Sequence, residues 1–304
     1  MRAFLLRFVL LILLLALVLF TVPSGALIVN ASAMELTGEG IVPLPIDTTP
    51  GYVPNKDCYL TDGLGYEDAS LKVQIETIRA YETTIQIIRI NVADPSQIRT
   101  AMAVNYGRTT TIVGPTIARR NNAVLAINGD FFSFHNRGYL IRQGKLYRDR
   151  PDGVFDVLII DDKGDFHILP KATSETLAAY QGVMVNTFNF GPGLVIDGKK
   201  TEVFEDNEST VPEKRTQRIC IGQTGPLSYI CIATEGPENR DSQGLTLPEL
   251  AQVASDYGLI NAYNLDGGSS STVVLNNKKI NALSTKKTRA IGDMLYFATA
   301  IPAE

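Results

Sequence analysis

Apolar and polar residues alternate along much of the chain after residue 69, a period that is typical of half-buried β-strands. Leu71 to Ile78 is the first such run, and Thr84 to Val92 and Ile98 to Val104 are the next two. Ala123 to Ile127 is apolar throughout, as in a strand that is covered on both faces. These runs predict a body that is rich in strands.

Turn signals and helical periods complete the predicted elements. Val154–Ile160 and Phe166–Leu169 flank a polar turn and predict a hairpin, and a second hairpin is expected to turn at Gly225-Pro226. The remaining predicted strands are Ile260–Leu265, Thr272–Leu275 and Met294–Ala298, and the predicted helices are Pro115–Asn121, Thr173–Tyr180 and Leu247–Tyr257. The fold class that follows is α+β: one strand-rich domain over residues 69–304, with a mainly antiparallel sheet and a few helices.

The N-terminus has the composition of an export signal. Met1 to Arg7 is short and basic, and Phe8 to Phe20 is an unbroken apolar run. We therefore expect an extracytoplasmic protein, with residues 1–33 as a cleaved signal peptide or an uncleaved anchor. Any membrane contact is expected through this segment alone. Residues 34–68 are rich in Pro, Gly and Thr and predict a linker to the domain.

Charge and cysteine content exclude some partners and leave one question open. The formal net charge is −4, so the chain lacks the broad positive field that attracts nucleic acid, and no nucleic-acid partner is expected. Cys220 and Cys231 flank the turn at Gly225-Pro226. They are either a cross-strand disulfide or two small buried strand residues.

Two segments end apolar strands in Asn, Gly and Asp, and both are candidates for a binding or catalytic site. The first is Asn128-Gly129-Asp130, and the second runs from Asn264 through Asp266 to the sequence Gly267-Gly268-Ser269-Ser270. Such dipeptides also form ordinary hairpin turns. Paired glycines nevertheless allow backbone N–H groups to approach an anion, and Asn side chains bind sugar hydroxyls. Two Asp carboxyls match the acid–base pair of a glycosidase.

Arginines and one glutamate are further candidates for the site. Arg218 and Arg289 are each suited to bind phosphate oxygens, and Glu235 is either a third carboxylate or part of an ordinary turn. The chain has two histidines, His135 and His167, which are too few for a zinc cluster. We therefore predict no metal and no cofactor, although oxygen-ligated Ca²⁺ stays open.

Several motifs, in their order and spacing, resemble the phosphodiester glycosidase family, which includes N-acetylglucosamine-1-phosphodiester glycosidases and bacterial exopolysaccharide-related proteins. The resemblance covers residue 100 to the end. The motifs are Ala126–Phe132, Gly138–Ile141 before Gly144-Lys145, Phe190–Val195, Arg218–Gly222, Glu235-Gly236, Gly244–Ala251, Asn264–Thr272 and Arg289.

The resemblance implies a hydrolase that cleaves the glycosidic bond of a sugar-1-phosphodiester to free sugar and a phosphomonoester. It implies a carbohydrate phosphodiester as the partner, with Asp130, Asp266 and Arg218 as catalytic residues. The implied substrate-binding residues are Asn128, Gly129, Asn264, Gly267, Gly268, Ser269, Ser270, Glu235 and Arg289. A non-catalytic module that binds envelope glycans is the alternative, because the same cleft would serve it.

Overall fold

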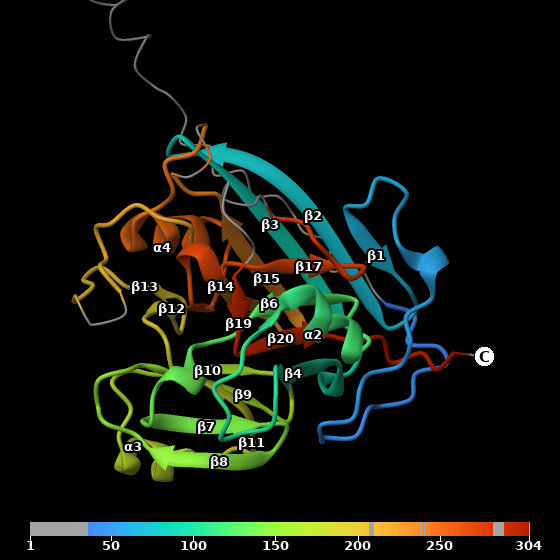
Figure 1. Cartoon of the computed structure of the whole chain (residues 1–304), viewed down its shortest axis with the longest axis horizontal. Coiled ribbons are helices and arrows are strands. Elements are labelled where there is room, and N and C mark those ends of the chain that lie inside the picture. The colour runs from blue at the N-terminus through green and yellow to red at the C-terminus, as the bar shows by residue number, and fades with distance from the viewer. Residues whose placement is uncertain (1–35, 207–209, 238, 240, 282–288, 304) are drawn as a thin grey trace, which may run out of the picture. The chain divides into compact units, whose positions relative to one another are not determined.

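Figure 1 shows a chain that consists mostly of strands, with a few short helices. The computed structural model describes residues 36–206, 210–237, 239, 241–281 and 289–303. The predicted export signal, residues 1–33, lies outside the described residues. Within the described part, no helix is long and apolar enough to cross a membrane.

The largest sheet contains the alternating segments at the start of the domain. In the described chain it has eight strands, with every neighbouring pair antiparallel, in the order β1-β2-β3-β15-β14-β16-β12-β13. Their bounds are β1 (Gly65–Glu67), β2 (Leu71–Ala80), β3 (Thr83–Val92), β12 (Gly193–Ile196), β13 (Lys199–Lys200), β14 (Ile219–Gly225), β15 (Ser228–Thr234) and β16 (Asn261–Asn264).

A second antiparallel sheet has the order β18-β17-β6-β20-β4. Its strands are β4 (Ile98–Met102), β6 (Leu125–Asn128), β17 (Val273–Leu275), β18 (Lys278–Lys279) and β20 (Asp293–Phe297). Smaller sheets are formed by β9 (Val157–Asp161) with β10 (Phe166–Leu169) and β11 (Met184–Phe188), by β7 (Gly138–Arg142) with β8 (Lys145–Arg150), and by β5 (Ile112–Val113) with β19 (Ala290–Ile291).

The helices are short, and two of them cover sheet faces. The α-helices are α2 (Gly114–Arg120), α3 (Ser174–Ala179) and α4 (Leu247–Asp256), and the 3₁₀ turns are η1 (Lys56–Cys58), η2 (Pro95–Gln97), η3 (Phe132–Phe134) and η4 (Gly268–Ser270). Thr246 and Glu249 form the predicted capping box of α4. Gly258, at φ +73°, follows its end in the left-handed conformation that favours glycine.

The central strands of both large sheets are buried on two faces, whereas β2 near the edge of the first sheet exposes Gln74 and Glu76. On β3, Ile88 and Ile90 face the main core, while Ile85 and Ile87 face the apolar side of α4. The main core also takes residues from β6, β17 and β20, so it lies between the two sheets. The opposite face of the second sheet packs on α2. The predicted α+β fold, a single strand-rich and mainly antiparallel domain, is confirmed.

The predicted linker packs on the domain instead of leading up to it. Residues 42–51, which we call the strap, are hydrogen-bonded to the second sheet and its neighbours: the Val42 amide donates to Ala300 O at 2.9 Å. The buried guanidinium of Arg99 donates to the carbonyls of Pro45, Asp47 and Thr49 at 2.9–3.0 Å. The compact unit accordingly begins at Leu36, and the boundary predicted at residue 69 is wrong.

The second hairpin rules out the disulfide that the sequence left open. Cys220 pairs with Ile232 and Cys231 pairs with Ile221, one position out of register with each other. Because cross-strand partners share a face, Cys220 points towards α4 and Cys231 into the main core. Both thiols are free and buried, so they are the small buried strand residues of the second interpretation.

Candidate active site

The two Asn-Gly-Asp-like segments meet, although 138 residues separate Asn128 from Asp266. Strand β6 ends at Asn128, whose side chain spans the gap: its Nδ2 donates to Asp266 O at 2.7 Å, and its Oδ1 accepts from the Thr272 amide at 2.9 Å. The Leu265 amide donates to Ile219 O at 2.9 Å, which fixes the second segment to β14. Asn128 therefore joins the two segments.

Neither segment is a two-residue hairpin turn. Strand β6 pairs with β17 and β20, and not with the chain that follows it. Gly129 is required for a close approach, because a Cβ there would lie 2.4 Å from Asp293 Oδ1. Because the backbone at Gly129 passes this close to Asp293, the neighbouring Asp130 also lies near Asp293.

A buried arginine holds these two aspartates together. Arg142, at the end of β7, donates to Asp293 Oδ2 from Nε at 3.1 Å and from Nη2 at 2.5 Å. The same Nη2 donates to Asp130 Oδ1 at 3.2 Å. We call Asp130, Asp266, Asp293 and Arg142 the carboxylate cluster, because the charge of Asp130 also acts on Asp266, and that of Asp266 on Asp293.

Aromatic rings enclose the guanidinium of Arg142. The ring centroid of Phe188 lies 4.4 Å from its central carbon and that of Phe132 lies 5.5 Å away. Burial alone would lower the pKa of Arg142, but the charges of Asp293 and Asp130 outweigh it and raise that pKa. The cluster therefore contains a fixed positive charge among three carboxyls.

The three carboxyls have different surroundings. Both oxygens of Asp130 are occupied: Oδ1 accepts from the Phe132 amide at 3.0 Å and Oδ2 from the Asn189 amide at 2.9 Å. Asp293 is fully buried, and burial raises its pKa despite its pairing with Arg142. Its Oδ1 has no hydrogen-bond partner among the described residues.

Asp266 is half-buried, and burial raises the pKa of its carboxyl to about 6. A hydrogen bond from Ser270 and the positive charge of Arg289 act in the opposite direction, and the charge of Asp130 adds to the rise. A carboxyl with a pKa near neutrality exchanges protons readily at physiological pH. Burial raises the pKa of Asp293 as well, to about 7, but Asp293 is fully buried, so Asp266 is the cluster carboxyl that combines a raised pKa with exposure to solvent.

Residues 121–298, more than half of the chain and all of the carboxylate cluster, match the model of the phosphodiester glycosidase family. The chain belongs to this family.

Other proteins are similar to this domain in sequence or in structure. The SPbeta prophage-derived uncharacterized protein YomE of Bacillus subtilis (strain 168) is 27% identical over 195 residues, which cover 62% of this chain and 30% of YomE. The chain therefore spans less than a third of that relative. The catalytic domain of zebrafish N-acetylglucosamine-1-phosphodiester alpha-N-acetylglucosaminidase, auto-inhibited by its pro-peptide, has a TM-score of 0.60 at 17% identity, over 83% of this chain and 87% of that one.

A hypothetical protein from Synechocystis has a TM-score of 0.51 at 16% identity, over 75% of this chain and 62% of that one. At these low identities, the two structures show that the fold is shared.

Two residues predicted for the phosphodiester glycosidase site lie outside the cluster. The guanidinium of Arg218 is buried and donates to three backbone carbonyls, those of Leu245, Val211 and Lys214. Its side chain lies on the α4 side of the first sheet, because it shares a face with Cys220. Glu235 accepts from Asn239 and Ser242 at the end of β15, as in an ordinary turn. The structure assigns both residues to local backbone and turn contacts.

The glycines of the second segment serve backbone packing. A Cβ on Gly267 would lie 2.6 Å from Gln217 O, and the Gly268 amide donates to that same oxygen at 2.8 Å. The Gly268 amide is therefore already paired, and not free for an anion as predicted. Asn264 is fully buried and donates to Gly191 O at 2.7 Å, while its Oδ1 has no partner among the described residues.

The remaining predicted residues are Ser269, Ser270 and Arg289, of which Ser269 and Arg289 are exposed. Arg289 is exposed and its Nη1 lies 3.5 Å from Ser269 Oγ. Ser270 is buried and hydrogen-bonds to Asp266. Arg289 is thus the arginine of the predicted pair that the structure places beside a cluster carboxyl.

Sequence reasoning missed Arg142 and Asp293. Each is a charged residue beside apolar residues of a buried strand, Leu140-Ile141 for Arg142 and Met294-Leu295 for Asp293. Because an isolated buried charge is costly, such a residue predicts an opposite charge nearby. That signal was available, but it does not identify the partner.

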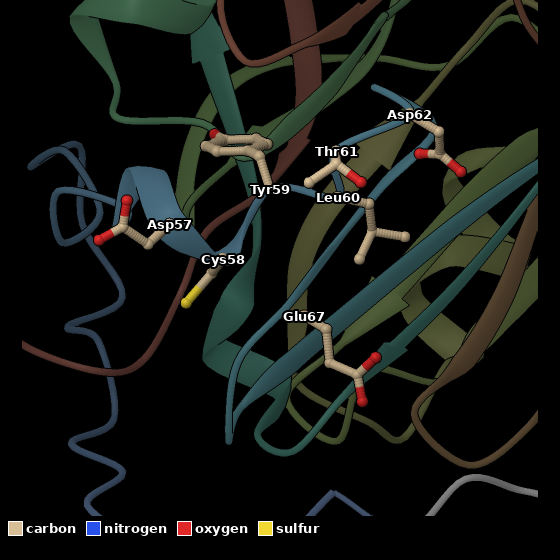
Figure 2. A pocket seen from close by; sticks show the side chains of 7 residues that line it. All are labelled: Asp57, Cys58, Tyr59, Leu60, Thr61, Asp62 and Glu67. Atoms are coloured by element: carbon tan, nitrogen blue, oxygen red, sulfur yellow. The ribbon is translucent and has the colours of Figure 1, made fainter.

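A surface depression of about 580 Å³ lies elsewhere, lined by Asp57, Cys58, Tyr59, Leu60, Thr61, Asp62 and Glu67. Figure 2 shows its side chains on the segment around η1 and on β1. It shares no residue with the carboxylate cluster, and burial raises the pKa of the Cys58 thiol. Among the residues that the structure describes, no group of three His, Cys or acidic side chains is placed to hold a metal ion.

Proposed function

We propose that this protein hydrolyses the glycosidic bond of a sugar-1-phosphodiester, outside the cytoplasm, on an envelope or extracellular glycan. The observation that carries the proposal is the half-buried carboxyl of Asp266, whose pKa is raised to about 6 beside two further carboxyls and a buried guanidinium. Glycosidases use such groups of carboxyls. Membership of the phosphodiester glycosidase family supports the substrate class.

The chemistry needs a base more than an acid. The bond between the anomeric carbon and the phosphate oxygen breaks, and the phosphomonoester leaves with the bonding electrons. Water supplies the new hydroxyl of the sugar and loses one proton. Because the leaving phosphate is already a stable anion, little protonation of it is required. Asp266, ionised above about pH 6, takes the proton from water.

The other cluster members hold the site in shape and supply charge. Asp130 is fixed by two backbone amides and Arg142, so its negative charge stays directed at the positive centre that develops on the sugar. Asp293 orients Arg142. The hydrogen bond from Asn128 holds the Asp266 segment next to the segment that carries Asp130, and Arg289 lies beside Ser269 on the exposed side of the Asp266 segment.

The test is release of reducing sugar from a panel of sugar-1-phosphodiesters by the purified full-length protein and by its Asp266→Asn variant. Turnover by the wild type that disappears in a folded Asp266→Asn variant supports the proposal. Binding of the panel without any turnover in either protein contradicts it, and leaves the glycan-binding module as the better description.

A further inference from the structure

Four arginine side chains are buried in the described domain, and they differ in whether the Nε atom has a hydrogen-bond acceptor. They are Arg99, Arg142, Arg148 and Arg218. In three of them Nε donates a hydrogen bond, to Tyr296 Oη, Asp293 Oδ2 and Leu245 O respectively. In Arg148, Nε is buried and has no acceptor among the described residues. A buried guanidinium N–H without an acceptor is costly and calls for an explanation.

Arg148 is hydrogen-bonded to the turn that follows Asp130. From β8, its Nη1 donates to the carbonyls of Phe132 and His135 at 3.0 and 2.5 Å. These carbonyls belong to η3 and the residue after it, directly downstream of Asp130. The charges of Asp130 and Arg142 both act on the Arg148 guanidinium. It therefore lies close to the carboxylate cluster.

The positive charge of Arg148 is not neutralised locally. Arg142 has two carboxylate partners, whereas Arg148 forms no ion pair with any residue that the structure describes. Burial lowers the pKa of Arg148, while that of Arg142 is raised. The pKa of His135 is lowered by burial and then by the charges of Arg137 and Arg148. Arg148 thus brings a positive charge without an ion-pair partner to the Asp130 side of the cluster, among the described residues.

Exposed groups lie beside Arg148. Arg150 is two positions further along β8, so it lies on the same face, and it is exposed. Tyr106 is 39% exposed, and its ring stacks on Phe132 at a centroid distance of 6.4 Å. The Tyr106 hydroxyl is near enough to influence Arg148.

We propose that Arg148, with Arg150 beside it, is a phosphate-binding subsite on the Asp130 side of the carboxylate cluster, where it holds the phosphate of the substrate. The inference rests on the proposed function for the identity of that substrate. A guanidinium binds phosphate oxygens through two parallel N–H groups, and Nε is one of the donors available for this. The subsite also replaces the phosphate ligand that was predicted at Arg218.

The test measures binding of inorganic phosphate to the full-length protein by calorimetry and by the phosphate-induced rise in Tm. Arg148→Gln keeps a donor for the two carbonyls but removes the charge, and Arg148→Lys keeps the charge. We expect phosphate affinity to fall about tenfold or more in Arg148→Gln and by only a few-fold in Arg148→Lys, because charged hydrogen bonds to phosphate are strong. Equal affinities in these two variants would overturn the subsite.

Two controls separate the subsite from a purely structural role. Arg218→Gln removes another buried arginine that is bonded to carbonyls, and we expect phosphate affinity to be unchanged. Exposed Arg150→Gln should weaken phosphate binding by a few-fold, and it decides the question if both Arg148 variants fail to fold. A loss in Arg218→Gln with no change in Arg150→Gln would also overturn the proposal.

The same variants distinguish the subsite from the proposed function. If phosphate binding depends on Arg148 but no sugar-1-phosphodiester is hydrolysed, the subsite stands and the function fails. If sugar is released and Arg148→Gln changes neither the KM for the phosphodiester nor phosphate affinity, the function stands and the subsite fails. If both hold, KM should rise about tenfold in Arg148→Gln, in step with the loss of phosphate affinity.

Discussion

At Asp266, burial and the charge of Asp130 oppose ionisation, while Ser270 and Arg289 favour it, and the balance gives a pKa of about 6. If the ionised carboxyl takes the proton from water, kcat/KM should rise as the pH increases through about 6 and then level off. A pH profile of kcat/KM measures this. A rate that falls above pH 6 would instead assign Asp266 the role of proton donor.

The companion prediction concerns the side chain itself. Asp266→Asn removes the base but preserves shape, so kcat/KM should fall by roughly 10²–10⁴-fold. The reducing-sugar assay measures the loss, and Asp57→Asn, at an exposed position away from the cluster, is the control. A folded Asp266→Asn variant that keeps its rate would contradict the assigned role.

Gly129 provides a test of how tightly the cluster is packed. A Cβ at this position would lie 2.4 Å from Asp293 Oδ1, so Gly129→Ala should displace Asp293 and cost about 1–3 kcal/mol of unfolding free energy. At Gly225 a Cβ meets no atom within 4 Å, so Gly225→Ala is a matched control. Denaturant unfolding compares the two variants, and equal stabilities would show that the contact relaxes without cost.

At this scale the sequence predicted Asn128, Asp130 and Asp266 because each lies where an apolar strand ends. Strand ends are visible in the hydrophobic period, and the structure brings these ones together. The sheet face on which a side chain lies is harder to predict from the sequence. Arg218 begins a strand and its face depends on sheet pairing, which is not encoded locally, so its predicted phosphate role fits poorly with the contacts it makes.

Among the elements, the strap (residues 42–51) has no period of its own and yet packs on the domain. Its contacts are backbone carbonyls held by Arg99 and the burial of Leu44. A segment without alternation that is rich in Pro and Thr reads as a linker, because the partner that orders it, Arg99, is about 50 residues away. Regular strands and helices were predictable from period and caps, whereas this strap was not.

The strap also gives a prediction. Arg99→Leu leaves three carbonyls without their donor, so the strap should detach and the unfolding free energy should fall by about 2–4 kcal/mol. Limited proteolysis at exposed Lys56, together with denaturant unfolding, measures both effects. Arg89→Leu, which breaks a partly exposed ion pair with Glu76, should cost less than about 1 kcal/mol. Unchanged cleavage in Arg99→Leu would mean that other contacts hold the strap.

For the whole molecule, the raised pKa of Asp266 suits the proposed catalysis but lowers the stability of the fold at neutral pH. A folded-state pKa above the unfolded value means that this group stabilises the fold at low pH, and that its contribution is lost as the pH rises through about 6. A rise from 3.8 to about 6 corresponds to about 3 kcal/mol at neutral pH. The wild type should therefore become less stable, relative to Asp266→Asn, as the pH increases from 4 to 7.

Unfolding free energies of both proteins, measured at several pH values, test this trade-off. We expect similar stabilities near pH 4 and an advantage for Asp266→Asn near pH 7.5, in the variant that has lost turnover. If the unfolding free energies of the two proteins change with pH in the same way, folding does not raise the pKa of the Asp266 carboxyl. Divergence together with lost turnover would mean that the fold gives up stability to keep a base at the end of a buried strand.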